Sequence, residues 1–466
     1  MKASRENDFV YQAVYRYLTL LIEEAGSSSA VRLPSLRQLA DRLNVSISTV
    51  QYAYSLLEKE GRVYSIAKSG YYAKALPALD VPGCGRDLLE TVYVNAKRPG
   101  MCVLSTDDPA SLQPLDRPLL MLERELLRQY PRQPQILVQP CGELELRTVL
   151  AARYTSSTVN CWHADDVYIG ADLRGVLEIL ISVLELRGAT VVVESPCDWV
   201  ILRLLDCANV RVIELPLLAD GVIDPQRLES LLKNEPVRLI LLSSALSMPH
   251  GSLLSVPNRQ AIAHLLGCHG TWVLENDCYS ELDEGIDSQR LRDWLDPDRL
   301  LVFSTFEKFI GAEAPFGFVL SRHWRSELQR HFLLRAFSVS LIRQKAIARL
   351  LGGGRLDQHL SVLRRMLKER RTQLIQLLRE RLGDALQVVE PQGGATVWVS
   401  SLRPVDMGNV FQRLLKHQII IAPGELFSLQ GLHAHHLRLN SLSHGDHDLA
   451  NVVGLLGDAL RLAPEG

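Results

Sequence analysis

The sequence predicts an α/β protein in which a small, mostly helical N-terminal domain precedes a large domain built on a mainly parallel sheet. Three observations predict this. The chain has 466 residues, which is enough for two or three domains. Its first seventy residues repeat apolar side chains at helical spacing. From about residue 111 onward, short apolar runs alternate with helical stretches, a pattern typical of strands buried on both faces.

The composition is that of an ordinary globular protein. Apolar residues make up 47% of the chain, charged residues make up 22%, and the net charge is −2, which argues against intrinsic disorder. The longest apolar run is interrupted by Glu178 and Glu185, so it is too short to cross a membrane. The N-terminus lacks the apolar segment of an export signal, and the cysteines form no C-x-x-C pair. We therefore expect a cytoplasmic protein with reduced thiols.

Three helices and a hairpin are predicted in the N-terminal domain. Residues 9–24 carry an apolar stripe on one helical face. Ser35 can cap a second helix, and Ser46 can cap a third. Residues 63–66 and 71–73 then alternate like two short strands. This order of elements is the plan of a winged helix-turn-helix domain.

The N-terminal domain is also the basic part of the chain. Residues 1–76 contain ten Lys or Arg and seven Asp or Glu, which favours a polyanion such as double-stranded DNA as partner. Gln51 suits an adenine, while Arg37 and Lys68 suit phosphates. The residues predicted to contact DNA are Ser35, Arg37, Ser46, Ser48, Thr49, Gln51, Tyr52 and Lys68. The alternative is a solvated basic surface without a DNA partner.

Residues 77–110 are predicted to be a linker, because they are rich in Pro and Gly and show no sustained period. One short strand or helix is expected within them, at 88–95. The remaining chain, residues 111–466, is expected to form a large domain at about 111–350 and a smaller α+β lobe at about 351–466.

Short apolar runs define the strands expected after the linker. In the large domain they are residues 191–194, 239–243, 272–275, 300–304 and 318–320. In the smaller lobe they are residues 395–400, 419–422 and 437–440. A long charged helix is expected from Leu356 to about Leu382, and a helix at 448–460 is expected to close the lobe.

Two groups of motifs carry a resemblance to known families. The stretch LPSLRQLADRLNVSISTVQYAYSLLEKEGRVYSIAKSGYYA resembles the DNA-binding domain of GntR-type bacterial repressors, although many of those carry an arginine where this chain has Ile47 and Ser48. The motifs VESPCDW, MPHG, ENDCYSEL, STFEKFIGAEAPFGFV, IIIAPGELFS and LRLN, in this order, resemble a fold-type-I aminotransferase. Together they resemble the MocR group of transcription regulators, whose aminotransferase-like body normally binds pyridoxal 5′-phosphate (PLP) and senses a small molecule. The resemblance implies a homodimer on a repeated operator.

The resemblance also identifies the residues of a PLP site. Lys308 aligns with the lysine that forms the Schiff base, Tyr279 with the tyrosine near the ring oxygen, and Arg438 with the arginine that binds a substrate carboxylate. Trp199 is expected to stack on a ring. These four residues match the family.

Other positions depart from the family in ways that disfavour PLP. Asn276 replaces the aspartate that keeps the pyridine nitrogen protonated. In the phosphate cup, Asp172 stands in a turn that is usually small and uncharged, Glu307 replaces a serine, and Pro315 replaces an arginine. Each like-charge pair at about 4 Å costs about 4 kcal/mol at an effective dielectric near 20. We therefore predict that the fold is kept, that PLP binds weakly at most, that enzymatic activity is lost, and that no metal is bound.

Three functions stay open on the sequence alone. The predicted one is a DNA-binding regulator whose degenerate body dimerises and senses an effector, which in one version is cationic or phosphate-free and lies near Asp172, Asp198 and Glu307. The second is a regulator that still binds PLP at Lys308. The third is an active PLP-dependent aminotransferase with an accessory DNA-binding head. A separate cluster, His433, His435, His436, His444 and His447, is expected to be a solvated loop, because it lacks the ligand spacing of a metal site.

Overall fold

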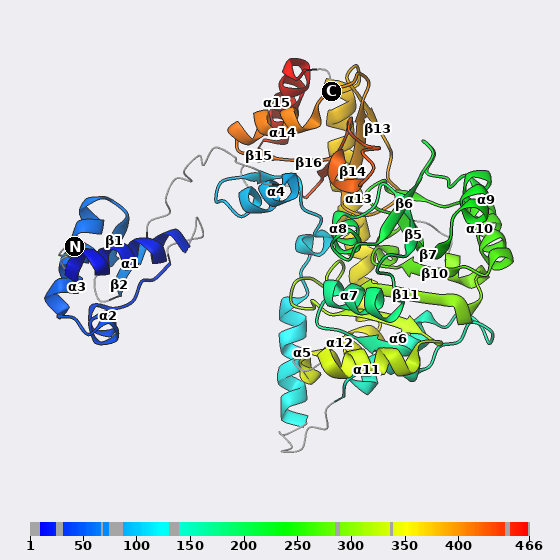
Figure 1. Ribbon diagram of the computed structural model, residues 1–466, viewed down its shortest axis with the longest axis horizontal. Coiled ribbons are helices and arrows are strands. Elements are labelled where there is room, and N and C mark those ends of the chain that lie inside the picture. Colours follow the sequence, from blue (N-terminus) through cyan, green and yellow to red (C-terminus); the bar gives the residue numbers. More distant parts are fainter. Residues whose placement is uncertain are drawn as a thin grey trace, which may run out of the picture. The chain divides into compact units, whose positions relative to one another are not determined.

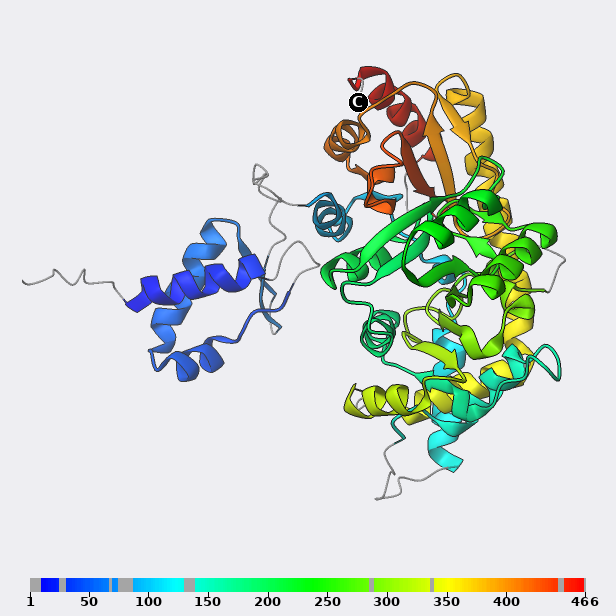
Figure 2. The same cartoon turned by 45° about the vertical axis from the view of Figure 1, so that its right-hand side comes forward.

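The computed structural model describes residues 10–24, 31–66, 69–73, 87–129, 139–284, 289–335, 339–442 and 448–464. The chain divides into two compact units, Met1–Met101 and Cys102–Gly466. Figures 1 and 2 show both units in ribbon form. Among the described helices, none combines the length and the apolar character that a membrane-spanning segment needs.

The first unit contains a three-helix domain with a hairpin (Figure 1). Its elements are α1 (Val10–Glu24), α2 (Leu36–Leu43), α3 (Ile47–Lys59), β1 (Val63–Ile66) and β2 (Gly70–Ala73), followed by α4 (Leu88–Ala96). The two strands are antiparallel, with Tyr64 opposite Tyr72. Leu18, Val50 and Leu57 are fully buried in the core between the helices. The predicted winged helix-turn-helix plan is confirmed, and the short element expected in the linker is a helix.

Local signals begin and end the helices of this domain. Ser35 caps α2 in a capping box, in which the amide of Gln38 donates to Ser35 Oγ at 3.3 Å and the amide of Ser35 donates to Gln38 Oε1 at 3.2 Å. Asn44 ends α2 in the left-handed region, at φ 52°, which asparagine tolerates better than most residues. Ser46 caps α3 by accepting from the amide of Thr49 at 3.1 Å.

A seven-stranded mixed sheet forms the centre of the second unit. Its strands are β4 (Val167–Ile169), β5 (Thr190–Ser195), β6 (Arg211–Pro216), β7 (Val237–Ser243), β10 (Trp272–Asn276), β11 (Leu300–Thr305) and β12 (Gly317–Ser321). Their order is β4-β12-β11-β10-β7-β5-β6. All neighbouring pairs are parallel except those of β12, which is antiparallel to both β11 and β4. This confirms the mainly parallel sheet.

Helices pack around this sheet, as Figure 2 shows. They are α5 (Asp116–Gln129), α6 (Leu144–Tyr154), α7 (Leu173–Val183), α8 (Trp199–Cys207), α9 (Pro225–Asn234), α10 (Val256–His269), α11 (Arg325–Arg335), α12 (Leu341–Gly352) and α13 (Arg355–Leu382). A short hairpin of β8 (Leu246–Ser247) and β9 (Ser252–Leu253) follows β7. The loops after β5, β10 and β11 meet at the carboxyl edge of the parallel strands, where α/β proteins bind ligands.

A smaller antiparallel sheet completes the second unit. Its strands, in spatial order, are β13 (Leu386–Val388), β14 (Thr396–Ser401), β17 (His436–Asn440) and β16 (Ala422–Pro423). Two helices accompany it, α14 (Met407–Lys416) and α15 (Leu449–Leu462). The lobe expected from the sequence is thus present, with its closing helix.

The start of the second unit differs from the predicted linker. The residues β3 (Cys102–Val103) form a parallel pair with β15 (Ile419–Ile420). The amides of Cys102 and Leu104 donate to carbonyls of this lobe at 2.7 Å, and both side chains are buried. A short 3₁₀ helix, η1 (Pro109–Leu112), follows. Residues 102–110 therefore lie in the second unit rather than in a linker.

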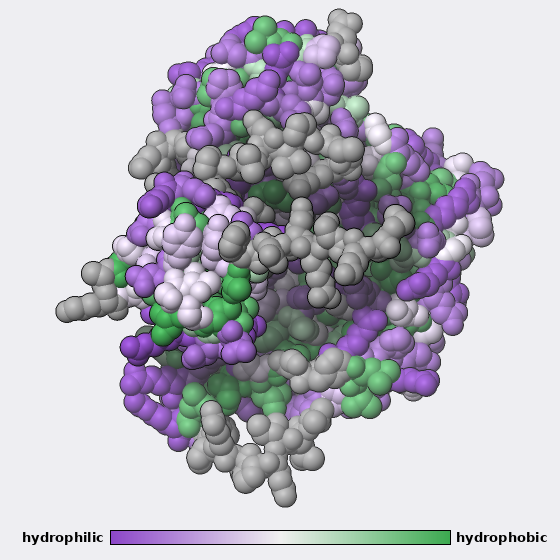
Figure 3. All heavy atoms as spheres, turned by 60° about the vertical axis from the view of Figure 1, so that its left-hand side comes forward, coloured by the Kyte–Doolittle hydropathy of each residue, from purple (hydrophilic) through white to green (hydrophobic). Residues whose placement is uncertain are grey.

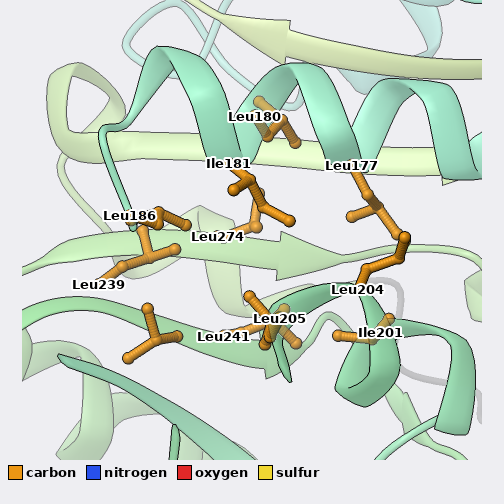
Figure 4. Close-up of a pocket in the computed structure, with 11 residues that line it drawn as sticks. Leu177, Leu180, Ile181, Leu186, Ile201, Leu204, Leu205, Leu239, Leu241 and Leu274 are labelled. Carbon is orange, nitrogen blue, oxygen red and sulfur yellow. The ribbon is translucent and has the colours of Figure 1, made fainter. Parts of the chain in front are cut away.

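The core of the large sheet contains a small apolar void (Figure 4). Only Leu, Ile and Val side chains line it, from α7, α8, β5, β7 and β10 and the residues next to them. Its free volume of about 10 Å³ is at the lower limit for a single water molecule. Because all of its lining side chains are aliphatic, the void is a packing feature of the core rather than a ligand site.

Candidate functional site

The recognition helix α3 presents exposed side chains along its N-terminal half. Ile47 is 46% exposed and Tyr52 is 50% exposed, and Gln51 lies exposed between them in the sequence. The ring of Tyr52 packs edge-on against Tyr11, with centroids 5.1 Å apart. Arg37 is exposed in the first turn of α2. The structure thus places Gln51 and Tyr52, which are predicted to contact bases, on one accessible helix. It places Arg37, which is predicted to contact a phosphate, on the preceding helix.

The serine hydroxyl groups that are predicted to contact DNA also cap helices. Ser46 Oγ lies 2.9 Å from Ser48 Oγ and 2.7 Å from Thr49 Oγ1, in addition to capping α3. Ser35 uses its hydroxyl in the capping box of α2. These serines therefore fix the helix ends that position Arg37 and Gln51. Lys68 lies outside the described residues.

Two further arginines line a groove that the sequence analysis did not single out. The groove is formed by Arg32, Leu33, Pro34, Ser35, Gln38, Leu39, Arg42 and Gly70. Arg32 precedes α2 and Arg42 lies in its last turn, and guanidinium groups in such a groove suit DNA phosphates. Their only sequence signal is the basic excess of the domain.

In the second unit, the structure brings together the four residues that match the family. Lys308 follows β11, Tyr279 follows β10, Trp199 begins α8, and Arg438 lies in β17. The Lys308 ammonium lies 5.2 Å from the centre of the Tyr279 ring, and the Arg438 guanidinium lies 4.5 Å from that of Trp199. Trp199 is also stacked on Phe427, with centroids 5.2 Å apart.

Asp107 also contacts these residues, and the sequence analysis missed it. Its carboxylate lies 3.6 Å from the ammonium of Lys308 and accepts a hydrogen bond of 2.5 Å from the hydroxyl of Tyr279. Its backbone carbonyl accepts a bond of 2.6 Å from Lys308 Nζ. Arg438 donates to the carbonyl of Ser105, two residues earlier. The expected Schiff-base lysine is thus bound to the protein's own carboxylate.

Charge–charge interactions keep this pair ionised. Burial raises the pKa of Asp107, but the positive charges of Lys308 and Arg438 outweigh that effect and hold its pKa below the ordinary value. Burial lowers the pKa of Lys308, but the carboxylates of Asp107, Asp198 and Glu307 outweigh it and raise the pKa above the ordinary value. The raised pKa favours the protonated form of the Lys308 amine.

Asp172 occupies the N-terminus of α7. Its Oδ1 accepts a hydrogen bond of 2.7 Å from the amide of Gly175. The start of α7 lies close to β12, since a Cβ added at Gly317 would be only 2.7 Å from Leu173 Cα. Gly317 itself is paired with Thr305 at the end of β11. The carboxylate therefore caps the helix that begins beside this strand end, where a phosphate would need free amides.

Glu307 and Pro315 supply no positive charge to this region. Glu307 is exposed, and its charge acts on Lys308. Pro315 precedes Phe316, whose carbonyl accepts from the hydroxyl of Thr305 at 3.3 Å and from the amide of Phe306 at 3.2 Å.

Asn276 is satisfied by its own loop, because its Oδ1 accepts from the amide of Cys278 at 3.2 Å. The carboxylates on either side of it are both paired with Arg292. Asp277 lies 2.8 Å from this guanidinium and also accepts from the hydroxyl of Tyr154, while Glu275 forms a close ion pair with it. At the position where the resemblance places the ring-nitrogen carboxylate, the chain thus has a neutral amide, and both neighbouring carboxylates are already paired with Arg292.

The histidine cluster is partly buried, so the solvated loop expected for it is wrong at two positions. His433 is 8% exposed and lies 2.9 Å from Ser195 Oγ, and His436 is stacked on Trp398. Burial lowers the pKa of His433 to about 3. His435 is half-buried, and His444 and His447 lie outside the described residues. Within the described part of the chain, His, Cys, Asp and Glu form no group arranged to hold a metal.

Known proteins resemble both units. Residues 10–72 match the family described as bacterial regulatory proteins, gntR family, and residues 131–454 match the family aminotransferase class I and II. The chain is 30% identical over 411 residues to the uncharacterized HTH-type transcriptional regulator YdcR of Escherichia coli (strain K12), covering 85% of this chain and 87% of that protein. It is 26% identical over 471 residues to the uncharacterized HTH-type transcriptional regulator YjiR of the same strain, covering 98% and 99%.

Solved aminotransferases share the fold of the second unit. The multiple substrate aminotransferase of Thermococcus profundus superposes with a TM-score of 0.72 at 19% identity, over 81% of this chain and 95% of that one. The kynurenine aminotransferase of Pyrococcus horikoshii superposes with a TM-score of 0.73 at 20% identity, over 82% and 95%. The chain therefore belongs to the MocR-like HTH-type transcriptional regulators, in which a gntR-type helix-turn-helix domain is joined to a domain of the aminotransferase class I and II family.

Proposed function

We propose that the protein is a DNA-binding transcriptional regulator whose aminotransferase-like unit dimerises and senses a small molecule without acting as an enzyme. The observation that carries this is the capped recognition helix α3, with Gln51 exposed on it and Arg37 exposed on the helix before it. A helix of this kind enters the major groove with its N-terminal residues at base edges, while the preceding helix contacts the backbone. The regulatory names of the relatives support the same role.

We further propose that PLP does not bind firmly and that transamination is lost. Three contacts support this: Asp172 on the amide of Gly175, Lys308 on Asp107, and Asn276 on its own loop. A PLP phosphate would bring two negative charges to a region where Asp172 and Glu307 already carry one each.

Homodimerisation is the third part of the proposal. Leu120, Met121 and Leu127 on α5 are 54%, 73% and 50% exposed, an apolar group on one helix that suits a subunit contact. On the face drawn in Figure 3, hydrophilic side chains cover most of the described surface and hydrophobic ones lie in separate groups. Two copies would present two recognition helices to a repeated operator.

DNA binding is tested by fluorescence anisotropy with duplexes from upstream of the protein's own and neighbouring genes and with scrambled duplexes. We expect preference for one upstream duplex. Arg37→Ala weakens binding to every duplex. It also makes the slope of log binding constant against log salt concentration shallower by about one, because one phosphate contact is lost. Arg227→Ala, which removes an exposed arginine from α9, serves as the matched control and leaves binding unchanged. Equal binding to all duplexes, with no effect of Arg37→Ala, would contradict the proposal.

A further inference from the structure

The groove on the N-terminal domain contains two arginines that take no part in the base contacts predicted for α3. It follows one face of α2, from Ser35 at the N-cap to Arg42 in the last turn, and it also includes Arg32 and Gly70. Its free volume is about 630 Å³, which is in the range of ligand-binding clefts rather than of packing voids. The groove is therefore large enough to take more than a single bound ion.

Basic and uncharged side chains line this groove. Arg32 and Arg42 each contribute a guanidinium group, and Ser35 and Gln38 contribute a hydroxyl and a carboxamide. Among the described residues that line the groove, none is acidic, and Asp41, the neighbour of Arg42 in the chain, is exposed but is not one of them. Guanidinium groups bind phosphates through parallel hydrogen bonds. The lining thus suits a phosphate.

The hairpin β1–β2 fixes the position of Arg32. The backbone of Arg32 forms a β-bridge with Tyr72, and the amide of Leu33 donates to the carbonyl of Tyr71 at 2.9 Å. Gly70 has a φ of 120°, which favours glycine, and a Cβ there would lie 3.7 Å from Arg32 Nε. The segment before α2 is therefore paired with the hairpin, and the bare backbone of Gly70 lies beside the Arg32 guanidinium.

The length of the groove matches several phosphates of one DNA strand. Helix α2 has eight residues, so its axis is about 12 Å long at about 1.5 Å per residue. One strand of duplex DNA carries a phosphate for about every 3.4 Å of helix axis, which places about three phosphates along α2. In helix-turn-helix domains the helix before the recognition helix crosses the DNA backbone. This favours DNA over an acidic peptide as the occupant.

We propose that the groove binds consecutive phosphates of one DNA strand, with Arg32 and Arg42 as two contacts in addition to Arg37. Phosphate contacts position a domain without reading bases, so these two arginines act on every duplex alike. The inference deepens the DNA-binding role proposed above and rests on it. It adds the surface, between α2 and the hairpin, that holds the DNA backbone.

Anisotropy titrations of the full chain with one mixed-sequence duplex, at several salt concentrations, test this inference. We expect Arg32→Ala and Arg42→Ala each to lower the affinity about fivefold at physiological salt. Each also makes the slope of log binding constant against log salt concentration shallower by about one, and the double variant makes it shallower by about two. Arg32→Lys and Arg42→Lys keep most of the slope, because the positive charge remains.

Arg16→Ala is the matched control. It removes an exposed arginine from α1 of the same domain, and it leaves the affinity and the slope unchanged. Far-UV circular dichroism of the double variant shows that the helices are still formed. Binding of a labelled oligoglutamate peptide to the original protein and to the double variant tests the other occupant.

Two outcomes overturn the proposal. One is a double variant with the original affinity and slope, while Arg37→Ala still weakens duplex binding. The other is a double variant that loses the peptide but keeps the duplex, because the groove then serves an acidic protein. The proposed function fails in a different way. If no upstream duplex is preferred and Arg37→Ala has no effect, while Arg32→Ala and Arg42→Ala still change the slope, only the proposed function is contradicted.

Discussion

The carboxylate of Asp172 accepts a hydrogen bond of 2.7 Å from the amide of Gly175, in the first turn of α7. This contact puts a negative charge of the chain itself at a helix N-terminus, where the helix dipole and free amides would otherwise stabilise a bound anion. One side chain therefore caps the helix and opposes a phosphate at the same place. The same principle recurs at Lys308, whose positive charge is met by Asp107 instead of by a ligand.

We predict that the phosphate cup can be restored by the variant Asp172→Thr, Glu307→Ser, Pro315→Arg. It removes two negative charges and adds one positive charge, and threonine still caps α7. We expect PLP affinity to rise at least about tenfold, which corresponds to about 1.4 kcal/mol. An absorbance titration with PLP measures the rise, and Lys308→Ala in the same background abolishes the visible band. A visible band in the original protein that disappears in Lys308→Ala would refute the loss of PLP binding.

A second prediction concerns base readout by α3. Gln51 suits adenine, and Ile47, exposed where many relatives carry arginine, suits the methyl group of thymine. We expect Gln51→Ala to lose about 1–3 kcal/mol at one A·T pair without changing the salt dependence. Ile47→Arg is expected to tighten binding to all duplexes and to steepen the salt dependence by about one ion.

Anisotropy titrations at several salt concentrations, with single base-pair changes in the duplex, measure both effects. Leu462→Arg, which adds the same charge at an exposed position of the second unit, is the control and leaves binding unchanged. If Gln51→Ala lowers the affinity for all duplexes equally, Gln51 contacts the DNA backbone rather than a base.

A third prediction distinguishes the role of Ser46 as the N-cap of α3 from its predicted contact with DNA. Because Ser46 caps α3, Ser46→Ala is expected to destabilise the helix by about 1 kcal/mol, and Ser46→Asn to restore the cap. Hydrogen exchange of the α3 amides then speeds up about fivefold in the alanine variant only. Ser55→Ala, which removes a hydroxyl from the middle of α3, does not speed up exchange. If Ser46→Asn restores protection but not DNA binding, the hydroxyl itself contacts DNA.

The features that the sequence predicted correctly rest on local signals. Ser35 and Ser46 are N-caps followed by helical apolar spacing, and both helices begin there. The five apolar runs expected in the large domain are strands of one sheet. The two missed strands, β4 and β6, lie at its edges, where β4 has only three residues and β6 is partly exposed, so neither produces a long apolar run.

Long-range contacts account for what the sequence did not reveal. Asp107 contacts Lys308, 201 positions away, and Ser105 contacts Arg438, 333 positions away, so no local pattern marks this segment as part of the site. The sequence suggests polar loop residues at His433 and His436, but packing against Trp398 buries His433 and leaves His436 half-buried. Burial by a distant aromatic ring has no signature in the neighbouring sequence.

The last prediction concerns pH and rests on His250. Its side chain is buried, and its Nδ1 lies 2.9 Å from Ser252 Oγ. Burial and the neighbouring His436 lower its pKa to about 4, against a small opposing effect of Asp220. The ordinary value for histidine is about 6.5. Between these two values the unfolded chain binds more protons than the native one. The contribution of His250 to the free energy of unfolding of the second unit is therefore fully present above about pH 6.5, and it falls as the pH drops toward about 4.

At about pH 5 the free energy of unfolding is lower by about 2 kcal/mol because of His250. All six tryptophans follow Met101 in the sequence, so denaturant unfolding followed by tryptophan fluorescence reports on the second unit alone. His250→Asn is expected to reduce the pH dependence by about that amount but not to abolish it, since burial also lowers the pKa of His433, to about 3. His417→Asn, at an exposed position, keeps the original slope. Equal slopes for His250→Asn and the original protein would show that protonation of His250 does not govern acid unfolding.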